Sequence, residues 1–149
     1  ADAEEKKLKD LQRELSSLEN EKSKMQKSIQ SGSSRISSEN ENITLQNNEL
    51  NTVNAAILEQ NRLLATMEEG TAKEELAKQI KELEKRKKTA ERNIKNAEKK
   101  IGKADSTIDQ ATGDIPRNER MQDKVREQIA AQDAVYQKYA DKLKRIKAY

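Results

Sequence analysis

The sequence of 149 residues contains no cysteine, histidine, tryptophan or phenylalanine, and its only aromatic residues are three tyrosines. Only 32% of the residues are apolar and 38% are charged, which is too little bulk for the core of an ordinary globular domain. The absence of cysteine excludes disulfide bonds and thiol chemistry, yet reducing and oxidising compartments both tolerate such a chain. A compact globular fold is therefore not expected.

The same absences argue against catalysis. The usual zinc ligands are missing, and no glycine-rich phosphate-binding loop occurs. An enzyme built only from carboxylates, lysines and hydroxyls would need a dry pocket to shift their pKa values, and a pair of helices offers no such concavity. We expect no enzymatic activity, no metal site and no cofactor. No run approaches the roughly 20 apolar residues of a transmembrane helix, so we expect no membrane span.

Proline and glycine are also scarce, with one proline and four glycines in the chain. The sequence is instead rich in Glu, Lys, Ala, Leu, Ile and Gln, residues that lose little rotamer freedom in a helix. Such a composition is typical of long solvated helices or of disordered chains, and the hydrophobic period distinguishes the two. The 30 basic and 27 acidic residues give a net charge of +3, which does not make nucleic acid the default partner.

The first half of the chain carries a heptad pattern, in which seam positions recur at alternating spacings of three and four. A disordered chain would not keep this phase over about eight repeats, so the pattern predicts a coiled-coil helix over residues 3–68. The seam positions are Leu8, Leu11, Leu15, Leu18, Lys22, Met25, Ile29, Gly32, Ile36, Glu39, Ile43, Gln46, Leu50, Val53, Ile57, Gln60, Leu64 and Met67.

A second seam follows, and its phase is offset by two residues from the first. Continuous coiled coils usually absorb insertions of three or four residues, so the offset indicates a real break and predicts a second helix over residues 72–149. The seam positions are Lys73, Leu76, Ile80, Leu83, Lys87, Ala90, Ile94, Ala97, Ile101, Ala104, Ile108, Ala111, Ile115, Asn118, Gln122, Val125, Ile129, Gln132, Tyr136, Tyr139, Leu143 and Ile146.

The break has the chemistry of a turn at residues 68–72. Gly70 can adopt the left-handed conformation that ends a helix, and Thr71 with Glu74 matches the capping box that begins one. Met67 is the last seam residue before this turn. Two helices joined by so short a connection predict an all-α fold, a long antiparallel coiled-coil hairpin that forms a single domain over residues 1–149.

The sizes of the seam residues select one register, in which facing residues have numbers that add to 140. In this register Ile43 faces Ala97 and Leu50 faces Ala90, so that large and small residues interdigitate as close packing favours. A register of 147 would need a turn of a dozen residues, and one of 133 leaves no room to turn. The sequence thus predicts which residues of the two helices meet.

A second irregularity lies near residues 113–116, where Gly113 precedes Pro116. Proline donates no backbone hydrogen bond and clashes with the carbonyl four residues earlier, so we expect a kink or a short break in the second helix. The heptad phase continues unchanged beyond Pro116, which argues against a third antiparallel helix. Gly32 lies at nearly the same height in the first helix, and we expect a bend or hinge at this level.

All three tyrosines fall within the last fourteen residues, where the register leaves about ten residues beyond the start of the first helix. An unpaired apolar stripe with aromatic residues is typical of a docking or oligomerisation surface. The alternative is a frayed terminus or a stump cut from a longer chain. The candidate protein interface consists of Tyr136, Tyr139, Leu143, Ile146 and Tyr149.

These features together favour a non-enzymatic structural or interaction coiled coil, acting as a stalk, spacer or adaptor whose ends contact other proteins. Its length and two-arm form resemble the hairpin stalk proteins of type III secretion and flagellar export, and also the hairpins of periplasmic adaptors and cell-wall hydrolase activators. The resemblance is one of shape and implies no residue roles. A core this narrow also suggests self-association into a four-helix bundle.

Two alternative functions remain open at this stage. The basic stretch 81–103 could bind nucleic acid or an acidic membrane surface, although acidic residues interrupt it and no aromatic residue is present for stacking. A straight parallel rod or filament is the other. The sequence begins with ADAEEKK rather than with methionine, so both a processed secreted or periplasmic protein and an excised fragment are compatible with it.

Overall fold

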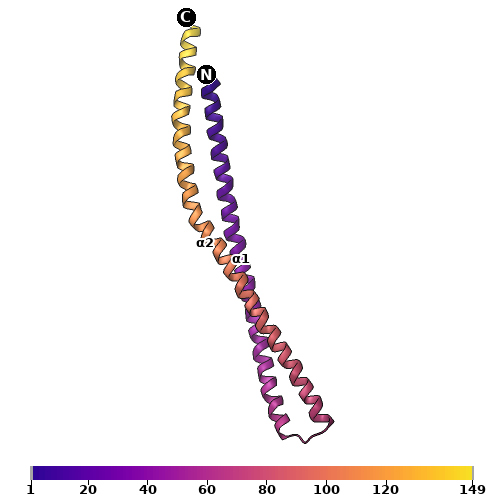
Figure 1. Cartoon of the computed structure of the whole chain (residues 1–149). Helices are drawn as coiled ribbons and strands as arrows, with labels where there is room; N and C mark the ends of the chain where they lie inside the picture. The colour runs from indigo at the N-terminus through magenta and orange to yellow at the C-terminus, as the bar shows by residue number, and fades with distance from the viewer. Residues whose placement is uncertain (1, 149) are drawn as a thin grey trace. The chain divides into compact units, whose positions relative to one another are not determined.

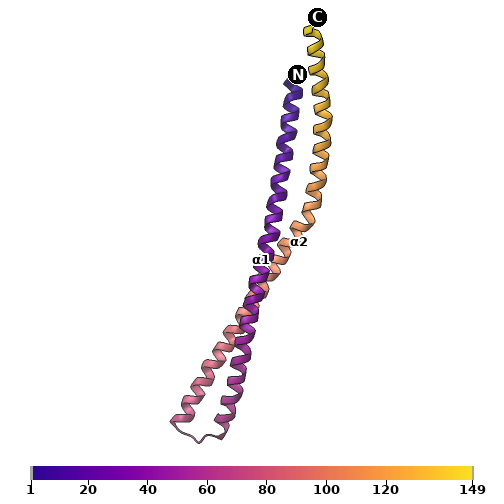
Figure 2. The same ribbon diagram turned by 180° about the vertical axis from the view of Figure 1, so that it is seen from behind.

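A computed structural model describes residues 2–148, which form two long helices (Figure 1). Helix α1 spans Asp2–Thr66 and helix α2 spans Thr71–Ala148, and the described residues contain no strand. The two helices pack against each other as a helical hairpin, which confirms the predicted fold class. Figure 2 shows the same chain from behind, with the short connection that joins α1 to α2.

The helix boundaries differ by one or two residues from those expected. The connection consists of residues 67–70 rather than 68–72, so α1 ends earlier and α2 begins earlier than the sequence suggests. A straight rod would require one helix through Gly70, and the end of α1 at Thr66 excludes that arrangement. Tyr149, the last residue of the predicted second helix, lies outside the described residues.

The predicted seams coincide with the sides of the two helices that face each other. Every seam position from Leu8 to Tyr136 is buried or half-buried, whereas most of the intervening positions are exposed. The buried apolar residues are Leu18, Val53, Ile80, Ala90, Ala97, Ala104, Ala111 and Val125. All of them are predicted seam residues, so the heptad pattern alone locates the core.

Polar contacts between the helices support the predicted register. Lys22 lies 3.0 Å from Glu119, and the amide of Asn93 donates to Gln46 at 3.5 Å. The residue numbers of these two pairs add to 141 and 139. Other cross-helix contacts scatter on both sides of 140 because long side chains reach along the helix axis. The sums run from 135 to 145 and most fall below 140, but their mean is closer to 140 than to 133 or 147.

The contacts divide the hairpin into two compact units. The terminal unit comprises Ala1–Ser31 with Thr107–Tyr149, and the turn unit comprises Gly32–Ser106. Each unit is an antiparallel pair of helical segments, so the chain that the sequence suggests as one domain has two structural units. Gly32 lies at a boundary between them, and the expected hinge at this residue stays a prediction.

Helix α2 continues through Pro116, and the short break expected near residues 113–116 does not occur. Proline leaves the carbonyl of Thr112 without its usual helical donor. Because Thr112, Gly113 and Pro116 are all exposed, water can hydrogen-bond to the freed carbonyl. A single lost bond on the solvent side does not end a long helix that is anchored on its other side. The milder expectation, a kink, stays a prediction.

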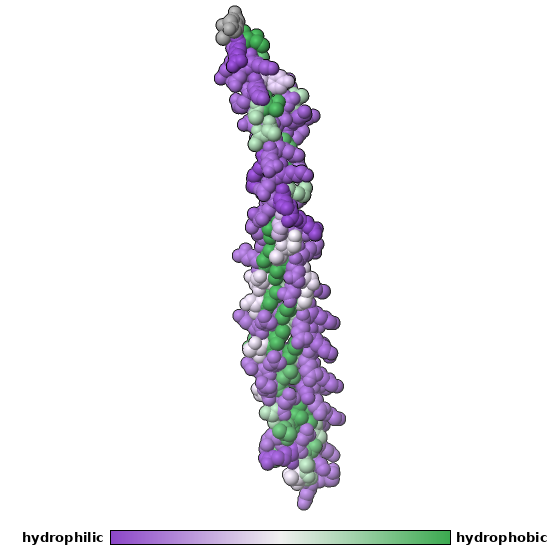
Figure 3. Space-filling view, turned by 90° about the vertical axis from the view of Figure 1, so that its left-hand side faces the viewer, coloured by the Kyte–Doolittle hydropathy of each residue, from purple (hydrophilic) through white to green (hydrophobic). Residues whose placement is uncertain are grey.

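Small residues on α2 set the packing of the turn unit. Ala90, Ala97 and Ala104 are buried, and Ala97 exposes only 1% of its surface. The residues that the register sets opposite two of them, Leu50 and Ile43, are only half-buried. A small residue such as alanine favours a close approach of the two backbones. Figure 3 shows the resulting stripe of apolar groups between hydrophilic flanks.

Candidate interaction surfaces

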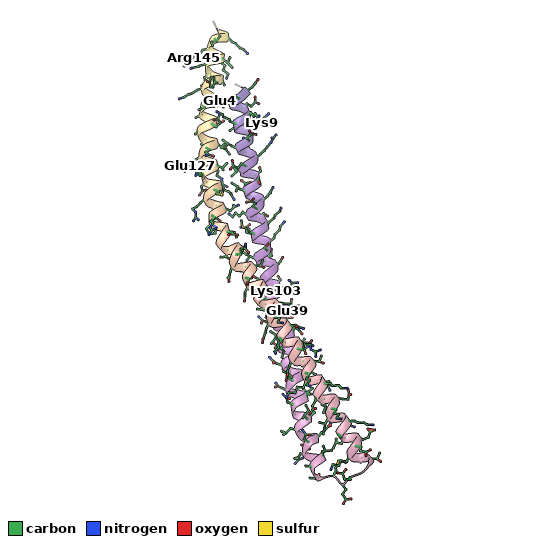
Figure 4. All side chains as sticks on the ribbon, in the orientation of Figure 1. Glu4, Lys9, Glu39, Lys103, Glu127 and Arg145 are labelled. Carbon is green, nitrogen blue, oxygen red and sulfur yellow. The ribbon has the colours of Figure 1, made fainter. Side chains whose placement is uncertain are left out.

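Helix α2 extends beyond the region where α1 covers it. Near the start of α1, the side-chain amide of Gln132 donates to the backbone carbonyl of Glu4 at 3.2 Å and also contacts the Glu4 carboxylate. Only two described residues of α1 precede Glu4, whereas sixteen described residues of α2 follow Gln132. Figure 4 shows Arg145 on α2 well beyond Glu4. The last turns of α2 therefore have no described partner helix.

The exposure of the seam rises along these last turns. Tyr136 is half-buried, Tyr139 and Leu143 expose 46% and 48% of their surface, and Ile146 exposes 71%. We refer to Tyr139, Leu143 and Ile146 as the C-terminal stripe. Of the five predicted interface residues, Tyr136 is half-buried and the three residues of the stripe are open to solvent, and their role as an interface stays a prediction. The fifth, Tyr149, lies outside the described residues.

Positive charge surrounds the C-terminal stripe. Residues 138–147 contain five basic residues and one acidic residue, Asp141. An open groove of about 350 Å³ lies along this part of the helix. Its walls are formed by Val135, Lys138, Tyr139, Asp141, Lys142 and Arg145. The surface therefore combines apolar groups with an excess of cations, the combination that suits an amphipathic, acidic ligand.

The turn itself is built differently from the sequence-based expectation. Gly70 has a φ angle of +157°, far from the angle near +57° of the left-handed helical conformation. Its carbonyl accepts the first hydrogen bond of α2, from the backbone nitrogen of Glu74 at 3.1 Å. Gly70 is therefore the N-cap of α2, and Thr71 is already a helical residue. The predicted capping box of Thr71 and Glu74 is wrong.

An exposed ion pair links the turn to α2. The ammonium group of Lys73 donates a hydrogen bond of 2.8 Å to the carboxylate of Glu69. This hydrogen bond, and then the positive charge of Lys73, hold the pKa of Glu69 below the ordinary value of a glutamate. Met67, the first residue of the connection, donates a backbone hydrogen bond of 3.3 Å to the carbonyl of Leu64 and is half-buried. The turn therefore exposes the carboxylate of Glu69, whereas its one large apolar residue, Met67, is half-buried.

A buried polar network crosses the terminal unit. The side-chain amide of Asn118 donates to the backbone carbonyl of Leu18 at 2.9 Å, and Gln122 donates to the Asn118 oxygen at 2.6 Å. Arg126 in turn donates to the Gln122 oxygen at 3.0 Å and lies 3.8 Å from Glu19. Asn118 and Gln122 are both buried. These groups satisfy one another, so the network can stabilise one register without leaving a polar atom unpaired.

Sequence reasoning missed this network. The sequence identifies Asn118 and Gln122 as seam positions, but the heptad analysis does not predict that these two consecutive polar residues bond to each other. Their spacing of four residues on one helix face was the available signal. The additional bond to the Leu18 carbonyl depends on the distance between the helices and has no sequence signature.

The basic stretch 81–103 is interleaved with carboxylates. Lys85 pairs with Glu82 at 3.2 Å, and Lys100 lies 3.9 Å from Glu39 of α1. The guanidinium of Arg86 contacts the carboxylate of Glu49, which also belongs to α1. Part of the positive charge of this stretch is therefore neutralised within the turn unit.

The described residues contain no group of three or more acidic side chains that could hold a metal ion. Neither of the two described helices has a segment that is long and apolar enough to cross a membrane. Comparison of the sequence and the structure with protein-family models, with curated proteins and with solved structures gives no match.

Proposed function

We propose that this chain is a non-enzymatic helical hairpin that acts as a stalk, spacer or adaptor and contacts other proteins at its ends. The observation that carries the proposal is the division of the apolar seam. From Leu8 to Tyr136 the two helices cover each other's seam, whereas Tyr139, Leu143 and Ile146 continue the same seam without cover. A long pair of helices that cover each other's apolar seam, followed by a short uncovered stretch of seam, is suited to act as a spacer that carries a binding surface.

The alternative of nucleic-acid or acidic-membrane binding through residues 81–103 has less support. Phosphate binding requires cations that are free to replace counterions. Arg86 and Lys100 instead face carboxylates of α1, and Lys85 faces one on its own helix. We therefore place the interaction surface at the C-terminal stripe rather than on this stretch.

Self-association into a four-helix bundle is a further part of the proposal. The large seam residues of the turn unit, such as Ile43 and Leu50, remain half-buried, so a second copy could cover them. Sedimentation equilibrium of the purified chain over a hundredfold range of concentration tests this idea. A mass that stays at the monomer value of 17.0 kDa would exclude the bundle.

Site-specific photocrosslinking in cells that naturally produce the chain tests the stalk proposal. A photoreactive amino acid is placed at Tyr139 on the C-terminal stripe, at Glu68 in the turn and at Glu91 on an exposed flank between them. We expect protein adducts from one or both ends and none from Glu91. Adducts that form only at Glu91 would show that the flank, and not an end, is the functional surface.

A further inference from the structure

The C-terminal stripe is a continuation of an interface that already exists in the molecule. Tyr139, Leu143 and Ile146 follow Gln132 and Tyr136 at the same spacings of three and four residues, so they lie on the face of α2 that α1 covers elsewhere. A helix is the partner of this face along the rest of the terminal unit. The geometry of the stripe is therefore that of half a coiled coil.

The charge of the stripe differs from that of the covered part of the same helix. Residues 117–137 contain four basic and four acidic side chains, whereas residues 138–147 contain five basic and one acidic. In the covered part, Arg126 of α2 faces Glu19 of α1, a cation opposite a carboxylate on the partner helix. The uncovered segment 138–147 therefore carries a net charge of +4, whereas the covered segment 117–137 carries none.

We propose that the C-terminal stripe binds an acidic amphipathic helix of a partner protein, which pairs with α2 beyond the start of α1. The inference rests on the proposed function and names the chemistry of the partner. Apolar residues of the partner at heptad spacing cover Tyr139, Leu143 and Ile146. Its Glu or Asp residues, in the positions that flank the heptad seam, face Lys142 and Lys147, which lie directly beside the stripe in the sequence.

Other occupants fit less well. Two copies of this chain that pair through their stripes would each bring the segment 138–147, whose net charge is +4, and like charges close to each other oppose pairing. A membrane-surface helix needs a broad apolar face, whereas only three large side chains form the narrow stripe here. Both occupants predict distinct outcomes in the experiment below.

The test uses the full chain with a fluorophore on its N-terminus and three synthetic helical peptides of three heptads. The peptides share leucine at the seam positions and carry glutamate, glutamine or lysine at the flanking positions. We expect the glutamate peptide to bind at least tenfold more tightly than the glutamine peptide in fluorescence anisotropy at low salt. Its affinity should fall as salt screens the charges, and the lysine peptide should not bind.

A double variant on the stripe and a matched double variant in the turn unit show where on the chain the peptide binds. Leu143→Asp combined with Ile146→Asp should abolish binding, because it places carboxylates on the stripe. Leu45→Asp combined with Leu58→Asp changes two leucines that are also exposed, by 65% and 75%, but lie in the turn unit, and it should leave the affinity unchanged. Circular dichroism verifies that both variants keep the helical content. Lys142→Glu combined with Lys147→Glu should reverse the preference, so that the lysine peptide binds better than the glutamate peptide.

Equal affinity for the three peptides, or binding that survives the two aspartates on the stripe, would overturn the proposal. Binding to vesicles that contain phosphatidylserine without binding to the glutamate peptide would identify a membrane surface instead. A dimer in sedimentation equilibrium that the two stripe aspartates dissociate would identify a second copy. If Tyr139 still forms protein adducts in cells while the glutamate peptide fails, the partner chemistry is wrong and the stalk proposal stands.

Discussion

The turn unit and the terminal unit follow the same heptad pattern but stabilise it in different ways. In the turn unit the buried residues are apolar or glycine, and two polar seam residues keep buried oxygen atoms without a hydrogen-bond partner, in Glu39 and Gln60. In the terminal unit, Asn118 and Gln122 are buried and hydrogen-bonded. Close packing favours stability, whereas a satisfied polar network favours one register over its neighbours.

The largest expected effect comes from overfilling the seam of the turn unit. Ala97→Leu inserts a large side chain where 1% of the residue is exposed, so the helices must separate, and we expect a loss of about 1–3 kcal/mol in the free energy of unfolding. Urea denaturation followed by circular dichroism measures it. Ala55→Leu, at an exposed position of the same unit, is the control and should change little. Equal stability of the two variants would contradict close packing around the alanines.

The next largest effect concerns the polar network of the terminal unit. Asn118→Ala removes the acceptor of the Gln122 amide and leaves that buried donor unpaired, so we expect a loss of about 1–2 kcal/mol. Hydrogen exchange of the amides around Gln122 should become faster, while exchange in the turn unit should stay the same. A loss of protection that spreads equally over both units would show that the network stabilises the whole chain rather than one unit.

Replacing a polar seam residue of the turn unit by an apolar one should raise the free energy of unfolding rather than lower it. Gln60 has a buried oxygen without a partner, so Gln60→Leu removes an unmet acceptor and adds apolar surface. We expect a gain of about 1 kcal/mol in urea denaturation. Asn118→Leu in the terminal unit is the matched comparison and should not stabilise the protein, because Gln122 loses its acceptor. A loss of stability in Gln60→Leu would mean that this glutamine contributes a hydrogen bond in solution.

The smallest effect is a pH dependence at the turn. The pKa of Glu69 is lowered in the folded chain, so the Glu69–Lys73 pair contributes fully at neutral pH, and the contribution is lost as the pH falls below the ordinary range of a glutamate. A side-chain NMR titration of Glu69 measures the shift. Lys73→Met should return the pKa to its ordinary value, while Lys78→Met should not. A titration curve of Glu69 that is the same in all three proteins would exclude the pair.

The two units also differ in how far their details could be predicted. In the turn unit, the sizes of Ile43 and Ala97 were enough to select the register, because the heptad pattern already aligned large and small residues. In the terminal unit, the bond from Asn118 to the Leu18 carbonyl depends on helix separation and on side-chain rotamers. Neither quantity is encoded in residue spacing.

Local signals at the ends and interruptions of the helices were less reliable than the heptad period. Thr71 and Glu74 fit a capping box by residue type, yet the first helical hydrogen bond of α2 runs to the carbonyl of Gly70, which is therefore the N-cap. Pro116 suggested a break, but packing on the opposite side of α2 keeps the helix continuous. Such local preferences contribute about 1–3 kcal/mol each, less than the summed packing of a long seam.

The sequence alone determined the helical class, the position of the seam and the point of reversal. All of these follow from the period of the apolar residues, which repeats many times and therefore tolerates single exceptions such as Lys22 or Gln60. Only the tertiary structure decided the cap at Gly70, the continuity at Pro116, the division into two units and the network around Asn118. Each of these depends on a few atoms whose separation is set by the partner helix.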